Sequence, residues 1–83
     1  MGLSELRELS LWGTRVDDAG LERLQALTRL ERLYLYGTST TDVGLKHLKR
    51  MSRLKHLDVQ STGVTDAGIQ DLKGAIPNVE ILR

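Results

Sequence analysis

The sequence contains no cysteine and a single proline, and only three of its 83 residues are aromatic. Without cysteine the chain has neither a disulfide framework nor a thiolate metal site, which are the usual supports of small secreted domains. Its longest apolar run is the LYLY of residues 33–36, far shorter than a membrane-spanning helix or a signal-peptide core. We therefore expect one small domain that makes no contact with a membrane, and the cytoplasm is the favoured compartment.

An excess of charge is also missing, because the net charge is only +1. This value argues against a general attraction to nucleic acid or anionic lipid. The basic residues concentrate in KHLKRMSRLKH, residues 46–56. Lys49 and Arg50 lie near the end of a predicted helix, where the helix dipole favours cations, so the simpler interpretation is a solvated helix end. Weak nucleic-acid binding through residues 46–56 is an alternative, and a steep dependence on salt would be its signature.

What the sequence does contain is internal similarity. Three consecutive segments of 24 residues, 3–26, 27–50 and 51–74, align with one another without gaps. Eight columns hold matching residues in all three segments, which indicates a repeat architecture. The columns are Leu6, Leu30 and Leu54; Leu9, Leu33 and Leu57; Leu11, Leu35 and Val59; Thr14, Thr38 and Thr62; Asp18, Asp42 and Asp66; Gly20, Gly44 and Gly68; Leu21, Leu45 and Ile69; and Leu24, Leu48 and Leu72.

The remaining residues, 75–83, begin a fourth segment. We expect this segment to be shifted by one residue, because Val79 and Leu82 then take the places of Leu54 and Leu57. It supplies a terminal strand that follows the third segment.

Each segment reads as a strand, a turn and a helix. In the first segment Leu9 and Leu11 alternate with other residues, so they face one side of a strand. Leu21, Leu24 and Leu27 follow at helical spacing and should form one buried stripe. Parallel strands that are joined by helical crossovers of this length stack unit upon unit.

The helix starts carry two further signals. Asp17, Thr41 and Thr65 are good N-cap residues, and the aspartate that follows each lies in the first turn, where the positive end of the helix dipole favours it. The glycine column lowers helix propensity, so we expect these glycines where each helix start packs tightly against its neighbour.

The pattern LxxLxLxxT followed by TDxGLxxL resembles the leucine-rich repeat, in particular its ribonuclease-inhibitor-like and cysteine-containing classes. The resemblance covers residues 3–82 and implies a right-handed α/β solenoid, with parallel strands on the concave face and helices on the convex face. Residues 1–83 would form one domain of three 24-residue repeats plus a terminal strand. The period is shorter than in the cysteine-containing class, and Thr14, Thr38 and Thr62 replace its cysteine. In the family this inward position bonds backbone groups of adjacent repeats, a role that a threonine hydroxyl can take.

In the proteins that this sequence resembles, the residues between the inward leucines form columns across the concave face. The columns here would be Glu8, Arg32 and His56; Ser10, Tyr34 and Asp58; and Trp12, Tyr36 and Gln60. All three aromatic residues fall within these positions, and exposed aromatic rings are typical of protein-binding hot spots. The alternative is that Trp12 and Tyr36, about 4.8 Å apart on neighbouring strands, stack and strengthen the sheet. Both interpretations can hold together.

Signals of catalysis are sparse. His56 and Asp58 would share one side of a strand about 7 Å apart, but no nucleophile, metal-ligand cluster or phosphate-binding loop accompanies them. The Gly-Thr pairs at residues 13–14 and 37–38 lack the lysine of a phosphate loop and read as bends. We therefore expect no enzyme activity, no cofactor and no metal.

The sequence thus predicts a non-catalytic protein–protein interaction module that binds an unidentified protein through the concave strand face. Two alternatives are a self-assembling structural module and a fragment of a longer repeat array. Both follow from the ends of the chain, because a solenoid shields its core with capping repeats and these ends look like ordinary units. Exposed apolar residues such as Leu3, Leu6, Ile81 and Leu82 would then recruit a second copy and form a homo-oligomer.

Overall fold

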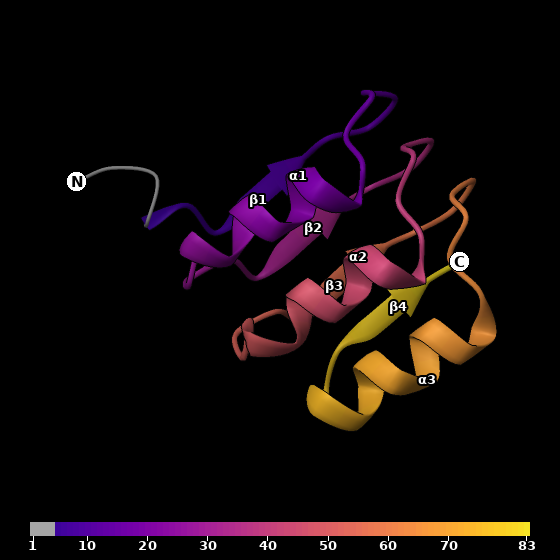
Figure 1. The fold of residues 1–83 in the computed structure, drawn as a ribbon. Helices are drawn as coiled ribbons and strands as arrows, with labels where there is room; N and C mark the ends of the chain where they lie inside the picture. Colours follow the sequence, from indigo (N-terminus) through magenta and orange to yellow (C-terminus); the bar gives the residue numbers. More distant parts are fainter. Residues whose placement is uncertain (1–4) are drawn as a thin grey trace.

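In the computed structural model, which describes residues 5–83, four short parallel strands form one sheet in the order β1-β2-β3-β4. The strands are β1 (Glu8–Ser10), β2 (Arg32–Tyr34), β3 (His56–Asp58) and β4 (Glu80–Leu82). The helices are α1 (Asp18–Arg23), α2 (Asp42–Lys46) and α3 (Asp66–Ala75), and the 3-10 turns η2 (Leu24–Ala26) and η3 (His47–Arg50) extend the first two. The chain is therefore an α/β protein in which a strand–turn–helix unit recurs along the sequence (Figure 1).

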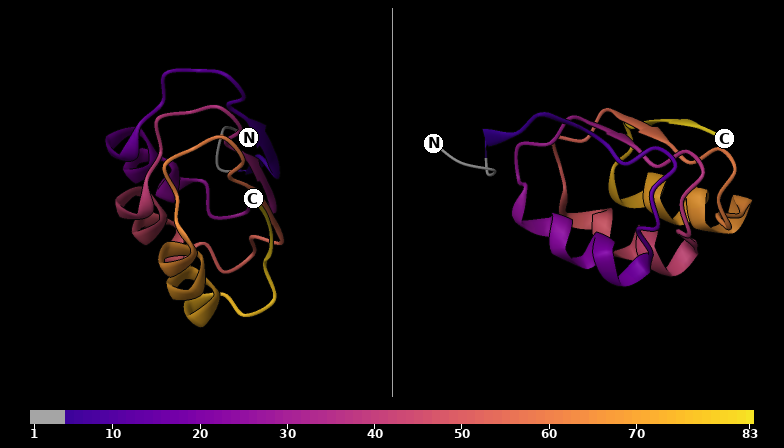
Figure 2. Two further views of the ribbon diagram at one scale, coloured as in Figure 1. Left: turned by 90° about the vertical axis from the view of Figure 1, so that its right-hand side faces the viewer. Right: turned by 90° about the horizontal axis from the view of Figure 1, so that it is seen from above.

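The strands and the helices form two layers. The helices α1, α2 and α3, which Figure 1 labels, lie on the same side of the sheet (Figure 2). The strand register follows the 24-residue period, because Leu9, Leu33 and Leu57 stand opposite one another on adjacent strands. Contacts between α1 and α2, and between α2 and α3, place consecutive units side by side. One face of the sheet is thus covered by helices, and the other is open.

The core lies between the two layers and consists mainly of leucine. The fully buried side chains include Leu21, Leu30, Leu33, Leu35, Leu45, Leu48, Leu54, Leu57 and Leu72. In the first unit Leu9, Leu11 and Leu24 are only half-buried, because within residues 5–83 this unit has a neighbour on one side alone. The predicted stripe of the first helix is therefore correct at Leu21 and Leu27, whereas Leu24 is only partly covered.

Each of the first three strands leads into a bend that takes one residue through the left-handed region. The backbone angle φ is 70° at Gly13, 72° at Gly37 and 56° at Ser61. Glycine adopts this conformation without steric cost, whereas the Cβ of a serine strains it. The predicted bends at residues 13–14 and 37–38 are confirmed, and they turn the chain from the sheet toward the helix layer.

The threonine after each bend residue closes the bend of its own unit. The buried Thr38 hydroxyl donates to the Leu35 carbonyl at 2.8 Å and shares a hydrogen bond with Thr40 at 2.9 Å. Thr14 and Thr62 donate in the same way to the carbonyl three residues before them, at 2.8 and 2.6 Å. The prediction that these hydroxyls link adjacent units is wrong, because each hydroxyl donates to a carbonyl of its own bend. Thr14 is also exposed rather than inward.

The aspartates of the helix starts make the polar link between units. The Asp18 carboxylate of the first unit accepts a hydrogen bond from the Thr41 N–H at 2.7 Å and another from the Thr41 hydroxyl at 2.5 Å. Asp42 accepts the same two bonds from Thr65, again at 2.7 and 2.5 Å. These four hydrogen bonds are termed the aspartate–threonine ladder. They join the start of each helix to the start of the next.

The ladder modifies the predicted N-caps. Asp17 accepts a hydrogen bond from the Gly20 N–H at 3.0 Å, and the Thr41 hydroxyl accepts one from the Val43 N–H at 3.2 Å, so both cap their own helices. Thr65 occupies the N-cap position of α3 but makes no capping hydrogen bond, and its hydroxyl donates to the aspartate of the second unit. In the described part of the chain, no helix has the length and apolarity needed to cross a bilayer.

Glycine makes room for the ladder. A Cβ atom on Gly44 would collide with the ladder aspartate of the preceding unit and would lie 2.8 Å from the Cδ1 atom of Leu21. A Cβ atom on Gly68 would collide with the next ladder aspartate. At Gly20 the obstacle is the Cγ2 atom of Val16 in the same unit, at 2.6 Å. The expectation of close packing against a neighbouring unit is confirmed at Gly44 and Gly68 and wrong at Gly20.

The last strand keeps the register of the others. Ile81 pairs with Leu57, so the predicted one-residue shift, which placed Leu82 there, is wrong at the strand. Val79 is nevertheless buried like Leu54, as predicted. Compared with the 24-residue spacing, the chain therefore has one extra residue before Val79 and one residue fewer between Val79 and Ile81.

The two ends differ in how far they cover their apolar residues. Leu3 lies outside the described residues. Leu6 and Ile81 are half-buried against the core, whereas Leu82 is 57% exposed. Asp66, which holds the ladder position in the third unit, pairs with Arg83 just beyond β4.

Gly44→Ala should destabilise the protein by about 1 to 3 kcal/mol, because the added methyl group displaces the ladder aspartate or Leu21. Gly74→Ala is the matched control, since a Cβ atom there meets nothing within 4 Å. This control should be stabilised by up to about 1 kcal/mol, because alanine is the better helix former. Urea unfolding followed by circular dichroism measures both changes. Equal stability of the two variants would contradict the steric role of Gly44.

Hydrogen bonds from the Thr65 hydroxyl and N–H, with a further contribution from the charge of Lys46, hold the pKa of Asp42 below its usual range. Such a carboxyl contributes stability above its unfolded pKa of about 3.9, and this contribution is lost as the pH falls through the lower folded value. The Asp42→Asn variant should therefore have a lower free energy of unfolding than the parent at neutral pH. The difference between the two free energies should become smaller as the pH falls. Urea unfolding across this pH range tests the expectation. Glu22→Gln removes an exposed carboxylate of α1 and should leave the parental profile unchanged.

Candidate functional site

The open face of the sheet brings together the nine residues that the sequence predicted to meet a partner. Alternation along each strand turns these side chains away from the helices and opposite to the inward leucines. The strand register aligns them in three rows across the sheet, and this surface is termed the sheet face. The rows are Glu8, Arg32 and His56; Ser10, Tyr34 and Asp58; and Trp12, Tyr36 and Gln60.

The third row lies just beyond the strand ends, where the bends begin. Backbone hydrogen bonds keep its members adjacent, because the Gly13 N–H donates to the Tyr36 carbonyl at 2.8 Å and the Gly37 N–H donates to the Gln60 carbonyl at 3.1 Å. The left-handed bends therefore have a second effect, which is to hold the aromatic residues at a defined spacing.

Two members of the sheet face escaped the sequence analysis. Glu80 continues the first row beside His56, and Leu82 continues the second row beside Asp58. They were missed because the fourth segment was expected to be shifted by one residue. Counting 24 residues on from His56 and Asp58 is the signal that finds them.

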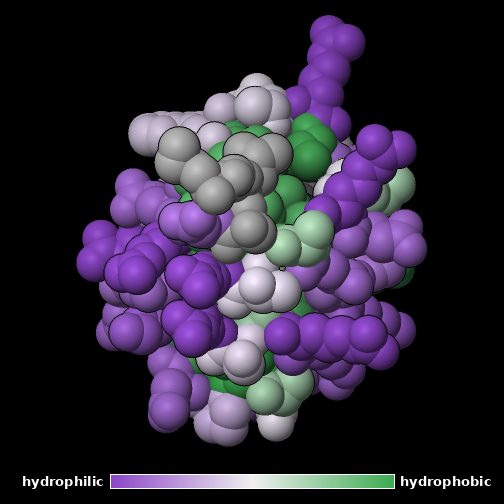
Figure 3. Space-filling model, turned by 90° about the vertical axis from the view of Figure 1, so that its left-hand side faces the viewer, coloured by the Kyte–Doolittle hydropathy of each residue, from purple (hydrophilic) through white to green (hydrophobic). Residues whose placement is uncertain are grey.

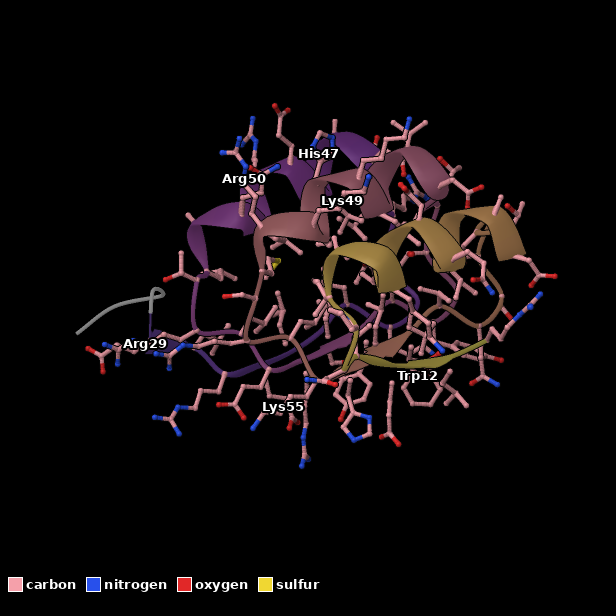
Figure 4. The ribbon with its side chains drawn as sticks, turned by 90° about the horizontal axis from the view of Figure 1, so that it is seen from below. Trp12, Arg29, His47, Lys49, Arg50 and Lys55 are labelled. Carbon is pink, nitrogen blue, oxygen red and sulfur yellow. The ribbon has the colours of Figure 1, made fainter. Side chains whose placement is uncertain are left out.

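The aromatic residues form the most exposed apolar feature of the sheet face. The ring centroids of Trp12 and Tyr36 are 5.2 Å apart, and the rings meet edge to face at an interplanar angle of 66°. Trp12 remains 67% exposed despite this contact. It lies on the side of the molecule opposite the helices (Figure 4). The predicted contact between the two rings is thus confirmed, although the rings meet edge to face rather than stacked, and it leaves most of the indole open to solvent.

The first row has a carboxylate at each end and two basic side chains between them. Arg32 Nη1 lies 3.8 Å from Glu8 Oε1, and His56 Nδ1 lies 3.3 Å from Glu80 Oε1. All four side chains are largely exposed, so these two contacts contribute little to stability. Their effect is to orient the charges of this row and to pair them with one another.

The second row contains a carboxylate in a different situation. Asp58 Oδ1 accepts a hydrogen bond from the Gln60 N–H at 2.9 Å, which fixes the orientation of the carboxylate. The side chain is half-buried between the neighbouring rows. Asp58 takes part in none of the ion pairs found within residues 5–83. It therefore presents a partly desolvated negative charge beside the tyrosines.

The structure directs His56 toward Glu80 rather than toward Asp58. Within residues 5–83, no three histidine, aspartate or glutamate side chains converge as a metal site would require. A solvent-open hollow of about 520 Å³ borders the charged row on the side where the chain enters the strands. Its walls are Glu31, Arg32, Lys55, His56, Asn78 and Glu80. The sheet face thus offers rings, charges and a shallow hollow, which are features suited to contact with a large ligand.

The basic segment 46–56 is divided between two sides of the molecule. His47, Lys49 and Arg50 lie with the helices, whereas Lys55 lies on the side of the sheet (Figure 4). Seen from the edge where the helices lead back to the strands, hydrophilic side chains flank a narrow band of apolar and neutral ones (Figure 3). Lys49 is also held by Asp71 at 2.7 Å. The segment therefore does not form one continuous basic surface.

The fold has a counterpart among solved structures. A chain in the structure of the Chaetomium Mex67:Mtr2 subunits superposes on this protein with a TM-score of 0.76 and 22% sequence identity. The similarity covers 93% of this protein but only 53% of that chain, so the protein spans about half of its length. No protein-family model and no curated protein sequence matches the chain. At this identity the likeness concerns the fold alone.

Trp12 should emit as a solvent-exposed indole and should be readily quenched by acrylamide. Trp12→Ser and Tyr36→Ser should each cost at most about 1 kcal/mol of stability, because exposed cross-strand pairs contribute little more. Leu33→Ala is the control on the opposite side of the same sheet and should cost about 2 to 5 kcal/mol. Fluorescence quenching and urea unfolding measure these effects. A blue-shifted, unquenchable Trp12 would place the indole in the core and contradict the described face.

Proposed function

We propose that this chain is a leucine-rich-repeat module that binds another protein through the sheet face and performs no catalysis. In that family the strands line the concave side of a right-handed solenoid, so the sheet face would be the concave surface. The 24-residue period, the in-register leucines and the helices on one side of a parallel sheet support this assignment. Right-handed crossovers are also the rule for parallel strands joined by helices.

The observation that carries the binding proposal is the placement of the aromatic residues. All three aromatic residues of the chain lie on the sheet face, and Trp12 is 67% exposed there. Exposure of the apolar indole surface to water is unfavourable. Folding does not remove this cost, because the ring contributes little to the core. Burial of such rings at an interface is a common source of hot-spot affinity. A partner that covers the sheet face would recover this free energy.

The structural neighbour supports a protein as the partner. The chain of similar fold comes from a structure described by two named subunits, Mex67 and Mtr2, and is therefore part of a protein complex. The division of residues 46–56 between two sides of the molecule makes nucleic acid the weaker alternative, because a phosphate backbone is best followed by a continuous basic surface. Self-assembly is the second alternative, and it is favoured by the exposure of Leu82 on the last strand.

Replacing Trp12 and Tyr36 together by serine should weaken binding at least tenfold, because hot-spot truncations commonly cost about 2 kcal/mol or more each. A displayed library of random peptides supplies the ligands, since peptides selected against the parent protein collect at its hot spots. Val43→Ser is the matched control, because Val43 is 57% exposed at the start of α2 and lies away from the sheet face.

The selected peptides should bind the Val43→Ser variant as tightly as the parent. Retained binding by the double variant would refute the proposed surface, as would an equal loss in the control. Light scattering of the parent at micromolar concentration tests self-assembly separately, and a monodisperse monomer would remove that alternative.

A further inference from the structure

The sheet face carries a charge opposite to that of the whole chain. Its strand positions hold three carboxylates, Glu8, Asp58 and Glu80, against one guanidinium, that of Arg32. With His56 neutral, these four charges sum to −2, whereas the chain as a whole carries +1. A protein that docks on this face therefore meets a negative surface, and a basic partner is the complementary one.

Only one of these three carboxylates is left for a partner. Glu8 pairs with Arg32, and Glu80 pairs with His56. Asp58 makes no ion pair within residues 5–83, and its single hydrogen bond from the chain, donated by the Gln60 N–H, engages Oδ1. Within residues 5–83 no group donates a hydrogen bond to Oδ2, and the Asp58 side chain belongs to the face that the partner would cover. Arg32 does not supply a cation to it, since this guanidinium is directed to Glu8.

The surroundings of Asp58 suit a cation that is flat and weakly hydrated. Asp58 stands directly opposite Tyr34 on the neighbouring strand. Tyr36 is its diagonal neighbour, at about 7 to 8 Å by sheet geometry, and the Trp12 ring adjoins Tyr36. Aromatic faces attract cations, and arginine adds stacking and a forked set of donors that lysine lacks. A guanidinium is also more easily desolvated than an ammonium ion.

We propose that the sheet face recognises an arginine side chain of its protein partner. The guanidinium lies against the tyrosine rings and donates hydrogen bonds to the Asp58 carboxylate. This inference rests on the proposed function and specifies the chemistry of the partner. The rings and Asp58 have separate roles. The rings supply contact area, whereas Asp58 selects a positively charged side chain of the partner.

The test uses small probes, so it does not require the partner. Acetyl-arginine amide is titrated into the isotope-labelled protein and followed through the amide signals of Tyr34 and Asp58 and the indole signal of Trp12. Acetyl-citrulline amide has the same shape without the charge, and acetyl-lysine amide with a free ε-ammonium group has the charge without the planar fork. We expect arginine to bind with a millimolar dissociation constant, lysine at least threefold more weakly, and citrulline without measurable shifts.

Two variants locate the charge that is responsible. Asp58→Asn keeps a carbonyl oxygen for the Gln60 N–H and should weaken arginine binding at least fivefold. Glu22→Gln removes the same charge from α1, away from the sheet face, and should leave arginine binding unchanged. Circular dichroism and thermal unfolding of both variants verify that the fold is retained.

The failures of the two proposals are distinguishable. Any of four results would overturn arginine recognition. Arginine could bind no more tightly than citrulline, or no more tightly than lysine. Arginine could cause no shifts of the amide signals, or the two variants could lose arginine affinity equally. Each of these outcomes leaves the binding role of the rings to the separate experiment with the serine double variant. The double variant could lose peptide binding while Asp58→Asn leaves arginine binding unchanged. This combination would retain the protein-binding face and reject its specificity for arginine.

Discussion

The contact on which the arrangement of units depends is the aspartate–threonine ladder. Each ladder carboxylate accepts two hydrogen bonds, one from the N–H and one from the hydroxyl of the threonine that precedes the next helix, as Asp18 does from Thr41. Charge-assisted hydrogen bonds of this kind fix both distance and direction. The backbone of the following helix must therefore approach closely, and the absence of a Cβ atom at Gly44 permits this approach. The threonine, the aspartate and the glycine of the TDxG segment thus form one device that acts across two units.

The sheet face depends on this spacing although it lies on the other side of the molecule. A ladder at the helix starts and hydrogen bonds between the strands together hold each unit at a constant offset from the next. Because the offset is constant, residues 24 positions apart stand side by side, and single side chains from different units combine into rows. Tyr34 and Asp58 are neighbours only for this reason. The adjacency of two residues far apart in sequence is therefore a consequence of the constant offset between units.

Much of this arrangement could be predicted from the sequence, because it follows from columns of identical residues. Strand order, inward leucines and the contact between Trp12 and Tyr36 all derive from the period. The direction of the polar contacts could not be predicted in the same way. The hydroxyl of Thr38 could donate a hydrogen bond either to its own bend or to a neighbouring unit, and both are chemically reasonable. Only the position of the Leu35 carbonyl in the folded chain decides which acceptor it uses. The register of the last strand failed for a related reason, since hydrophobicity alone cannot tell Ile81 from Leu82 as the inward residue.

The contrast between the two sides of the strands is what makes the outward residues informative. At the inward position of the four strands the chain places Leu9, Leu33, Leu57 and Ile81, which are nearly interchangeable in size and polarity. Core packing demands this uniformity, because each side chain meets the same neighbours in the next unit. At the adjacent outward position the same strands carry a serine, a tyrosine, an aspartate and a leucine. The requirements of core packing leave that position free to differ between units, so the tyrosine and the aspartate there are the residues on which the proposed contact with a partner rests.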